Sequence, residues 1–313
     1  MKMEREPLCI MMVGLPGSGK SVSASCMKQT WDYGNGPHVN IHSSDDIRQE
    51  LYGDANNQEH NDKVFRCLHA RIKADLEQGV DVIFDATNIN KKQRIHFLNM
   101  VGGICVPVCH VMATPIDHCL WRNQKRGRQI PPNAIRGMLN KFQPPAYSEG
   151  FSSIHYETAS CDAFSVEAFA KISDTFDQRN RHHALTLGQH SQRVVEYLYQ
   201  HGITDKRLLF AGYLHDNGKL LTATPTNQRG ESDGDYHYYN HENVGAYNSI
   251  FYAFNAGFNP NDVTYISNLI YYHMRPYIAW KQSVKAYQRD LKLCGADFIR
   301  DVELLHEADL ASH

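Results

Sequence analysis

Short apolar runs recur through the first half of the chain, and amphipathic stretches lie between them. Apolar runs of this length, bounded by turn residues, predict buried strands; they are Leu8–Val13, Val39–Ile41, Val80–Phe84 and Ile104–Met112. The stretches near residues 20–30, from residue 46 and within 59–78 predict helices, and the last helical pattern of this half ends near Phe142. Strands that alternate with helices predict a parallel sheet with helices on both faces.

The pattern changes at Gln143, where QPPAYSEGFSS is too rich in proline, glycine and serine to continue a helix. After Ala163 no run predicts a strand, and helical periodicity dominates; helices are expected near 165–176, 186–201, 205–215, 241–255, 260–273 and 281–308. We therefore expect an α/β domain over residues 1–150 and an all-α bundle over 160–313, with the boundary between Pro144 and Ser160. A chain of 313 residues is long enough for two such domains.

Composition narrows the range of possible functions. With 32 Lys and Arg against 34 Asp and Glu, the net charge is −2, which excludes a general polyanion binder and leaves short, local contacts to any nucleic acid. The eight cysteines form no CxxC pair and lie in apolar segments, as expected for reduced thiols in a cytoplasmic protein. The first residues lack the pattern of a signal peptide, and no stretch is long enough to span a membrane.

The first apolar run leads into a glycine-rich loop, GLPGSGKS, which fits the phosphate-binding pattern GxxxxGK[ST]. Its glycines let backbone N–H groups curl around phosphate oxygens, and the following helix adds its positive end. We expect Lys20 to neutralise the β- and γ-phosphates of ATP and Ser21 to ligate Mg²⁺; the cradle itself is made by Gly14, Gly17, Ser18 and Gly19. The alternative is a glycine-rich turn without a nucleotide.

Further polar residues follow the predicted strands, at the sheet edge where ligands of parallel sheets bind. Asp45 is placed to accept the proton of an attacking hydroxyl, and Arg48, three residues on, to grip a phosphate; the alternative is that Asp45 or Ser44 only caps a helix. Asp85 is placed to orient Arg48 or to contact Mg²⁺ through water, or it belongs to a turn. Arg122 and Arg126, four apart on one predicted helix, form a lid over a triphosphate or a solvated face.

In order and spacing, GLPGSGKS, NIHSSDDIRQEL, DATNINKKQR and WRNQKRGRQIPPNAIRGM resemble the 5′-polynucleotide kinase domain of phage and bacterial end-healing enzymes, over residues 8 to 142. The resemblance implies that Lys20 and Ser21 hold ATP and Mg²⁺ and that Asp45 is the general base. It further implies that Arg48 binds the phosphate on the 3′ side of the acceptor nucleotide, and that Arg122 and Arg126 are the lid arginines.

Histidines and aspartates dominate the candidate chemistry of the second half. His215 and Asp216 follow the apolar stretch RLLFAGYL, and Gly218 suits the end of that helix. Other helical stripes each carry one such residue on the apolar side; they are His190, His241, His273 and Asp309. Ligands from five helices predict a metal site inside an α-bundle, although any one histidine alone is more often a core or surface residue. We expect His182, His183 and His237 to be surface residues of polar loops.

The order His, His-Asp, His, His, Asp resembles the HD phosphohydrolase superfamily over residues 165 to 313. That resemblance implies a main metal on His190, His215, Asp216 and Asp309, and a second on His241 and His273 with Asp216 bridging. Two metals would activate a hydroxide and clamp a phosphoryl group; Mn, Fe, Ni or Co is the expected class, and Lys219 is placed to reach the phosphate. NRHHALTLGQHSQRV and NHENVGA also resemble the HD domain of bacterial tRNA CCA-adding enzymes.

Together these patterns predict a bifunctional end-healing enzyme. The kinase would phosphorylate a 5′-hydroxyl of RNA or DNA, and the second domain would remove a 3′-phosphate or open a 2′,3′-cyclic phosphate, giving ends for a nucleic-acid ligase. One alternative is a small-metabolite or nucleotide kinase fused to an HD nucleotide phosphohydrolase. Another is a regulatory P-loop ATPase whose HD bundle only binds a ligand.

Overall fold

The structure of the chain is a computed structural model that describes residues 5–33, 38–158, 161–181 and 184–313. It has two compact units: Met1–Ile135 with Pro145–Thr158, and Arg136–Pro144 with Ala159–His313. His182 and His183, expected in a polar loop, lie outside the described residues. Within the described ranges, no helix is long and apolar enough to cross a bilayer.

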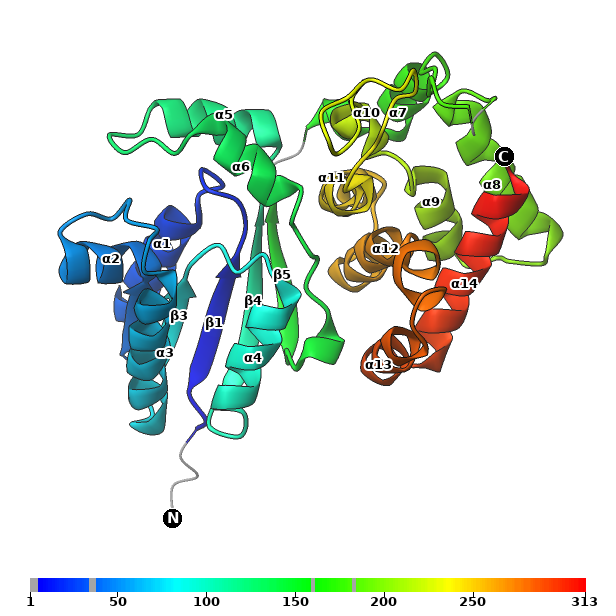
Figure 1. Ribbon diagram of the computed structural model, residues 1–313. Coiled ribbons are helices and arrows are strands. Elements are labelled where there is room, and N and C mark those ends of the chain that lie inside the picture. Colours follow the sequence, from blue (N-terminus) through cyan, green and yellow to red (C-terminus); the bar gives the residue numbers. More distant parts are fainter. Residues whose placement is uncertain (1–4, 34–37, 159–160, 182–183) are drawn as a thin grey trace. The chain divides into compact units, whose positions relative to one another are not determined.

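The first unit contains a five-stranded sheet in the order β2-β3-β1-β4-β5, and every neighbouring pair is parallel (Figure 1). The strands are β1 (Leu8–Val13), β2 (Val39–Ser43), β3 (Asp81–Asp85), β4 (Val106–Ala113) and β5 (Ser153–Thr158). The predicted parallel sheet is thus confirmed, and its first four strands coincide with the four apolar runs.

The edge strand β5 was not predicted, and it lies within the stretch that we expected to separate the domains. It pairs with β4, with Ser153 opposite Val108. Its sequence SIHYET carries one buried residue, Ile154, because an edge strand has solvent on one side. Without an apolar run it gave no strand signal.

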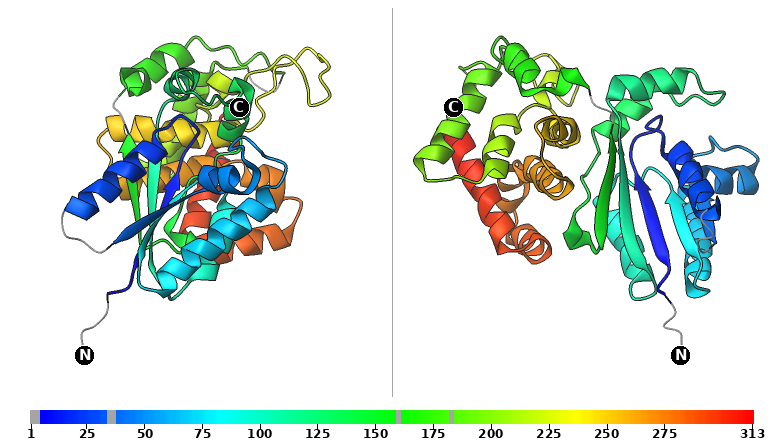
Figure 2. Two further views of the ribbon diagram at one scale, coloured as in Figure 1. Left: turned by 90° about the vertical axis from the view of Figure 1, so that its left-hand side faces the viewer. Right: turned by 180° about the vertical axis from the view of Figure 1, so that it is seen from behind.

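Helices cover both faces of the sheet (Figures 1 and 2). Consecutive strand residues point to opposite faces: Ile83 packs in a cluster with Ala24 and Met27 of α1, whereas Phe84 contacts the rings of His69 and Phe97 on α3 and α4. These helices are α1 (Lys20–Tyr33), α3 (Asn61–Glu77) and α4 (Lys91–Val101). The helices packed on both faces fix the sheet, so the carboxyl ends of its parallel strands β1, β2 and β3 lie at one edge of the unit.

The second unit is built of helices (Figure 2). They include α8 (Leu187–Gln200), α9 (Lys206–Leu214), α11 (His241–Asn255), α12 (Pro260–Tyr272), α13 (Val284–Cys294) and α14 (Ala296–Ala311). The single helix expected over 281–308 is two helices, because Gly295 adopts φ +86°, which a continuous helix cannot contain. The other five predicted helices each match an observed one within a few residues.

Residues 136–144 belong to the second unit because hydrogen bonds and ring packing join them to its helices. The side-chain amide of Asn243 donates to the carbonyl of Phe142, and the Phe142 ring packs edge-on against Tyr247. Gln143 donates to the hydroxyl of Tyr271. The chain therefore enters the second unit before it returns to add β5 to the sheet.

Candidate functional site

The glycine-rich loop runs from the end of β1 to the start of α1. Gly17 has φ +83°, and a Cβ there would lie 2.4 Å from the backbone oxygen of Cys119. Only glycine fits such a position, because a side chain would be strained by the backbone and would also clash. The close approach holds the loop against α5 (Ile116–Gln124).

Hydrogen bonds fix the loop in its curled shape. The carbonyl of Ser18 accepts from the Thr114 hydroxyl at 2.9 Å and from Nη1 of Arg122 at 3.1 Å. The ammonium of Lys20 donates to the carbonyls of Gly14 and Leu15, each at 2.9 Å. Arg122, expected near the phosphates, thus lies directly on the loop.

The negative groups around the buried ammonium of Lys20 do not fully offset the cost of burying its charge. Burial lowers the pKa of Lys20 to about 8, although Asp85 at the end of β3 raises it in part. An anionic phosphate at the loop would restore the charged form. Ser21 follows in the first turn of α1 and is exposed, so its hydroxyl is open to a ligand.

Asp45 lies at the start of α2 (Ser44–Tyr52), directly after β2. Nη1 of Arg48 donates to Oδ1 of Asp45 at 2.9 Å, and Nη2 of Arg48 donates to Asn61 at 2.8 Å. The helix cap is Ser43, whose side chain accepts from the amide of Asp45. Neither Asp45 nor Ser44 is therefore the cap, and the Asp45 carboxylate pairs with arginine instead.

One role expected of Asp85 was to orient Arg48. In the structure Asp45 and Asn61 orient the guanidinium of Arg48 instead. Asp85 is buried at the end of β3 and acts electrostatically on Lys20 and on Asp46. Burial together with Asp45 and Asp85 raises the pKa of Asp46. Carboxylates and the loop lysine thus share one edge of the sheet, where a cation and a phosphate would balance their charges.

The expectation that Arg122 and Arg126 share one helix is wrong. α5 ends at Gln124, and Arg126 lies beyond it. The cause is Asn123, whose side chain accepts from the amide of Ile130 and donates to its carbonyl, closing a loop over the intervening residues. Arg126 still acts on the charge of Lys20, so it remains near the phosphate loop.

Arg128, on the same loop, was missed as a candidate. Its Nη1 lies 2.6 Å from Oδ2 of Asp45, and its Nε donates to Asn56. Three arginines stand within seven residues of the sequence, but spacing along a helix is the wrong criterion, because the helix ends after the first of them, Arg122.

In the second unit, four buried imidazoles have the same orientation. Each Nδ1 lies on a backbone carbonyl, which can only accept, so Nδ1 carries a proton and Nε2 is the ring atom that faces the cluster. The ring and carbonyl pairs are His190 with Ser312, His215 with Gly212, His241 with Tyr238 and His273 with Ile270. This is the arrangement in which histidines bind metal ions.

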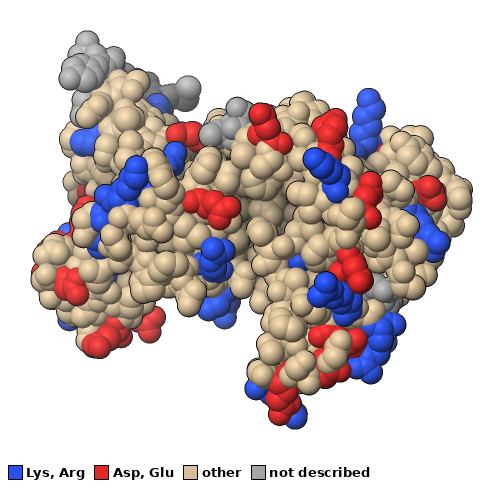
Figure 3. All heavy atoms as spheres, turned by 90° about the horizontal axis from the view of Figure 1, so that it is seen from above, with Lys and Arg blue, Asp and Glu red and all other residues tan. Residues whose placement is uncertain are grey.

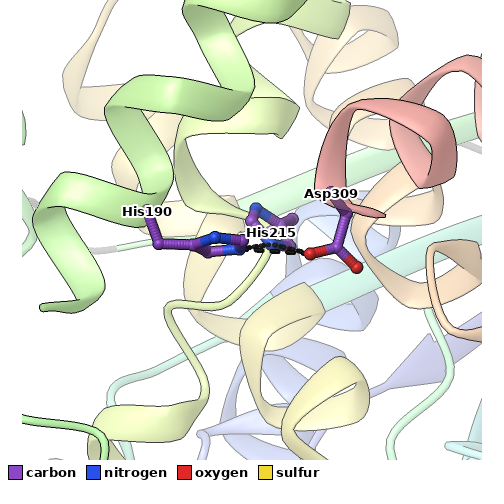
Figure 4. Close-up of side chains that lie close together, drawn as sticks. All are labelled: His190, His215 and Asp309. Atoms are coloured by element: carbon purple, nitrogen blue, oxygen red, sulfur yellow. Dashed lines mark hydrogen bonds and ion pairs between the residues drawn. The ribbon is translucent and has the colours of Figure 1, made fainter. Parts of the chain in front are cut away.

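The four Nε2 atoms converge in two pairs. Nε2 of His190 lies 3.1 Å from Nε2 of His215, and Nε2 of His241 lies 3.2 Å from Nε2 of His273. Figure 4 shows His190, His215 and Asp309 pointing toward one another from α8, the end of α9 and α14. The ligand atoms form two sets of three, and within each set they lie within 4.8 Å of one another. The first set is His190, His215 and Asp309, and the second is Asp216, His241 and His273.

Asp216 lies between the two sets. Its Oδ2 is 3.3 Å from Nε2 of His215, and its Oδ1 is 3.2 Å from Nε2 of His241. Two lone pairs facing each other at these distances repel unless a cation or a proton lies between them. The donor set, imidazole with carboxylate, therefore fits two divalent transition-metal ions.

The charges of the cluster agree with this fit. Burial opposes a charge on His215, but Asp216 and Asp309 outweigh it and raise the pKa of His215 to about 10. Burial and the neighbouring His241 and His215 lower the pKa of His273 to about 3. The site therefore favours positive charge and keeps His273 in its neutral, metal-binding form.

Lys219 also lies at this cluster. Its Nζ is 2.6 Å from Oδ2 of Asp216 and donates to Oε1 of Gln178 at 2.8 Å. The sequence placed Lys219 near a phosphate; the structure adds its contact with Asp216. His237, by contrast, pairs with Asp233 in a loop.

Gly218 has a different role from the helix end that we expected. Its φ is −65°, an ordinary right-handed value, and α10 (Lys219–Thr222) follows it. A Cβ on Gly218 would lie 2.0 Å from the carbonyl of His241 and 2.7 Å from the amide of Gly245. The glycine therefore lets the segment of His215 and Asp216 pack directly against α11.

Sequence reasoning also missed His313, whose ring stacks on His190 and whose Nε2 lies 3.5 Å from Oδ1 of Asp309. Tyr277 was missed as well: Asp309 and Asp216 add to the effect of burial in raising its pKa to about 12. No helical stripe indicated either residue.

Comparison with known proteins is informative for the first unit. A family model described as AAA domain matches residues 9–145. The L-seryl-tRNA(Sec) kinase of Methanococcus maripaludis is 27% identical over 149 residues, 44% of this chain and 53% of that protein. The chain thus aligns with about half the length of this curated relative. The chain is thus similar to an AAA domain over residues 9–145, and its curated relative is a kinase.

Solved structures show weaker likeness. One is a chain of the Pnkp1/Rnl/Hen1 RNA repair complex, with 23% identity, a TM-score of 0.40 and coverage of 45% of each chain. Another is a gluconokinase from Sinorhizobium meliloti, with 17% identity and a TM-score of 0.35, covering 50% of this chain and 85% of that one.

Proposed function

We propose that the chain is a bifunctional enzyme that prepares nucleic-acid ends. The first unit transfers the γ-phosphoryl group of ATP to a 5′-hydroxyl, and the second unit hydrolyses a 3′-phosphate or a 2′,3′-cyclic phosphate. The products would be the 5′-phosphate and 3′-hydroxyl that a nucleic-acid ligase joins.

The kinase proposal rests on Asp45 and Lys20 at one sheet edge. Lys20, with Gly14, Gly17, Ser18 and Gly19, would hold the phosphates of ATP, and Ser21 would ligate Mg²⁺. The acceptor oxygen forms a bond to the γ-phosphorus, the bond from that phosphorus to the oxygen of ADP breaks, and the hydroxyl proton passes to Asp45. Arg122 and Arg126 offset the negative charge of the transferred group.

The acceptor is proposed to carry a phosphate next to its hydroxyl, because the buried guanidinium of Arg48 faces Asp45 and matches a phosphate in shape. Lys and Arg side chains are interspersed with Asp and Glu on the face shown in Figure 3, rather than gathered into one basic area. That distribution suits recognition of one end of a strand and not of a long duplex.

The hydrolase proposal rests on Asp216 between two histidine pairs. His190, His215 and Asp309 would hold one metal ion, and His241 and His273 a second, with Asp216 shared. Two such ions supply Lewis acidity for hydrolysis of a phosphate ester. Lys219, hydrogen-bonded to Gln178 and Asp216, would neutralise charge on the bound phosphate.

The curated relative, a kinase of L-seryl-tRNA(Sec), favours a second candidate acceptor, a hydroxyl carried by an RNA-linked group. One assay separates the two: an oligonucleotide with a 5′-hydroxyl and a 3′-phosphate is incubated with labelled ATP and each divalent metal. Label at the 5′ end and release of inorganic phosphate support the proposal. Absence of 5′ label while another hydroxyl acceptor is labelled would replace the acceptor class.

A further inference from the structure

The carboxylate of Asp45 is held on both of its oxygens. Arg48 donates to Oδ1 at 2.9 Å, and Arg128 lies 2.6 Å from Oδ2. We propose that Arg128 pairs with Oδ2 of Asp45, as a cap on the general base, until a phosphate of the acceptor binds the guanidinium. Only acceptors that bear a phosphate would then remove this cap from Asp45. This inference rests on the proposed kinase function and names the acceptor class of that site.

Two asparagines orient the guanidinium groups: Asn56 in the loop between α2 and α3, and Asn61 at the start of α3. Asn56 accepts from Nε of Arg128 at 2.5 Å, and Asn61 accepts from Nη2 of Arg48 at 2.8 Å. The two asparagines thus orient one arginine toward each oxygen of Asp45. Because both asparagine contacts are directed hydrogen bonds, the paired arrangement is more specific than the pairing of two surface charges.

Each oxygen of Asp45 already has one cationic partner, so fewer of its lone pairs are open to an incoming hydroxyl. Guanidinium groups donate and never accept, so an acceptor hydroxyl competes with them for the oxygens of Asp45. The side chain of Arg48 is 7% exposed, whereas that of Arg128 is 27% exposed and that of Asp45 is 46% exposed. The contact open to exchange is therefore the one made by Arg128, since partly exposed ion pairs are weak.

A phosphate near the hydroxyl would compete for Arg128 well, because it offers two oxygens to the planar fork of the guanidinium. When Arg128 turns to that phosphate, Oδ2 of Asp45 becomes free beside the hydroxyl. A neutral acceptor such as a nucleoside leaves the cap in place, and so does water. The arrangement would thus select a nucleotide or an oligonucleotide and suppress hydrolysis of ATP by water.

The test compares the full chain with Arg128→Ala, using labelled ATP and three conditions: no acceptor, a nucleoside, and the same nucleoside with a 3′-phosphate. We expect acceptor-independent hydrolysis of ATP to rise about tenfold in the variant. KM for the phosphorylated acceptor should rise roughly tenfold or more, the effect of losing one charge-assisted contact. KM for the nucleoside should stay within about twofold, because Arg128 has no phosphate to bind there.

Arg71→Ala is the matched control, because Arg71 forms a 2.6 Å ion pair with Glu50 and both side chains are largely exposed. It should change neither the rate of ATP hydrolysis nor the two KM values. Asn56→Ala, which removes only the partner that aims Arg128, should shift the same quantities in the same direction by a smaller factor. Thermal unfolding of each variant, measured in parallel, reports that the first unit is folded.

The outcomes separate the two proposals. A native chain that labels no 5′-hydroxyl acceptor refutes the kinase proposal itself. An active native chain whose Arg128→Ala variant shows unchanged ATP hydrolysis and unchanged KM overturns the capping role. An equal loss of transfer to both acceptors, without a rise in hydrolysis, also overturns it and makes Arg128 a residue of the ATP site.

Discussion

Oδ1 of Asp216 lies 3.2 Å from Nε2 of His241, while Oδ2 of the same carboxylate faces His215 at 3.3 Å. One side chain therefore serves two sets of ligands that are otherwise on different helices. The number of metal ions that the cluster would hold therefore depends on residues that are far apart in sequence.

His241→Ala should lower the metal content from about two ions per chain to about one, since the second set would keep only His273 and the shared Asp216. Phosphatase activity should fall with it. Elemental analysis of the purified protein measures the count. His237→Ala is the control, because His237 pairs with Asp233 in a loop and should leave both ions bound. One ion per chain in the native protein would show a mononuclear site.

Gly218→Ala should destabilise the second unit, because the new Cβ would lie 2.0 Å from the carbonyl of His241. Overpacking of this kind costs about 2–3 kcal/mol. The shift would also move His241 away from Asp216 and weaken binding of the second ion. Gly137→Ala, with no atom within 4 Å of the added Cβ, is the control and should not destabilise the chain. Urea unfolding of both variants decides; equal midpoints would contradict the close approach.

Binding of ATP should become weaker above about pH 8. The pKa of Lys20 is lowered to about 8 by burial, so the ammonium is present below that pH and is lost as the pH rises through it. Bound phosphates favour the charged form and raise the pKa again, so binding near pH 8.5 should take up protons. Calorimetry in buffers of different ionisation enthalpy measures this uptake. Lys20→Arg should abolish it, because arginine stays charged; persistent uptake would assign the proton elsewhere.

Arg48→Ala should reduce kcat/KM for a nucleoside 3′-phosphate far more than for the nucleoside. Loss of a charge-assisted contact costs about 2 kcal/mol, or roughly thirtyfold. Steady-state assays with the two acceptors measure the ratio. Arg66→Ala, an exposed arginine of α3, should leave it unchanged. Equal losses on both acceptors would show that Arg48 supports the fold of the site and not recognition of a phosphate.

Much of the fold was visible in the sequence, because buried parallel strands need continuous apolar runs and amphipathic helices need apolar stripes. β1 and the loop that follows it are the clearest case. β5 was not visible, since an edge strand with one buried residue, Ile154, has no such run.

The ligand cluster shows a similar division. Helical stripes indicated that His190 and Asp309 face inward, but not that every Nδ1 lies on a carbonyl, which depends on tertiary packing. Gly218 was misread because a sequence shows a glycine and not the backbone that passes beside it. Arg128 was overlooked because its contact with Asp45 joins a loop to the first turn of α2, 83 positions apart, a pairing that no local pattern encodes.

We propose that one chain has two independent activities, and a crossed inactivation tests this most directly. Asp45→Ala and Asp216→Asn are each assayed on one oligonucleotide with a 5′-hydroxyl and a 3′-phosphate, with labelled ATP and a divalent metal. We predict that Asp45→Ala loses 5′ labelling and still releases 3′-phosphate, and that Asp216→Asn does the reverse. Loss of both activities in either variant, or of neither, would contradict the account.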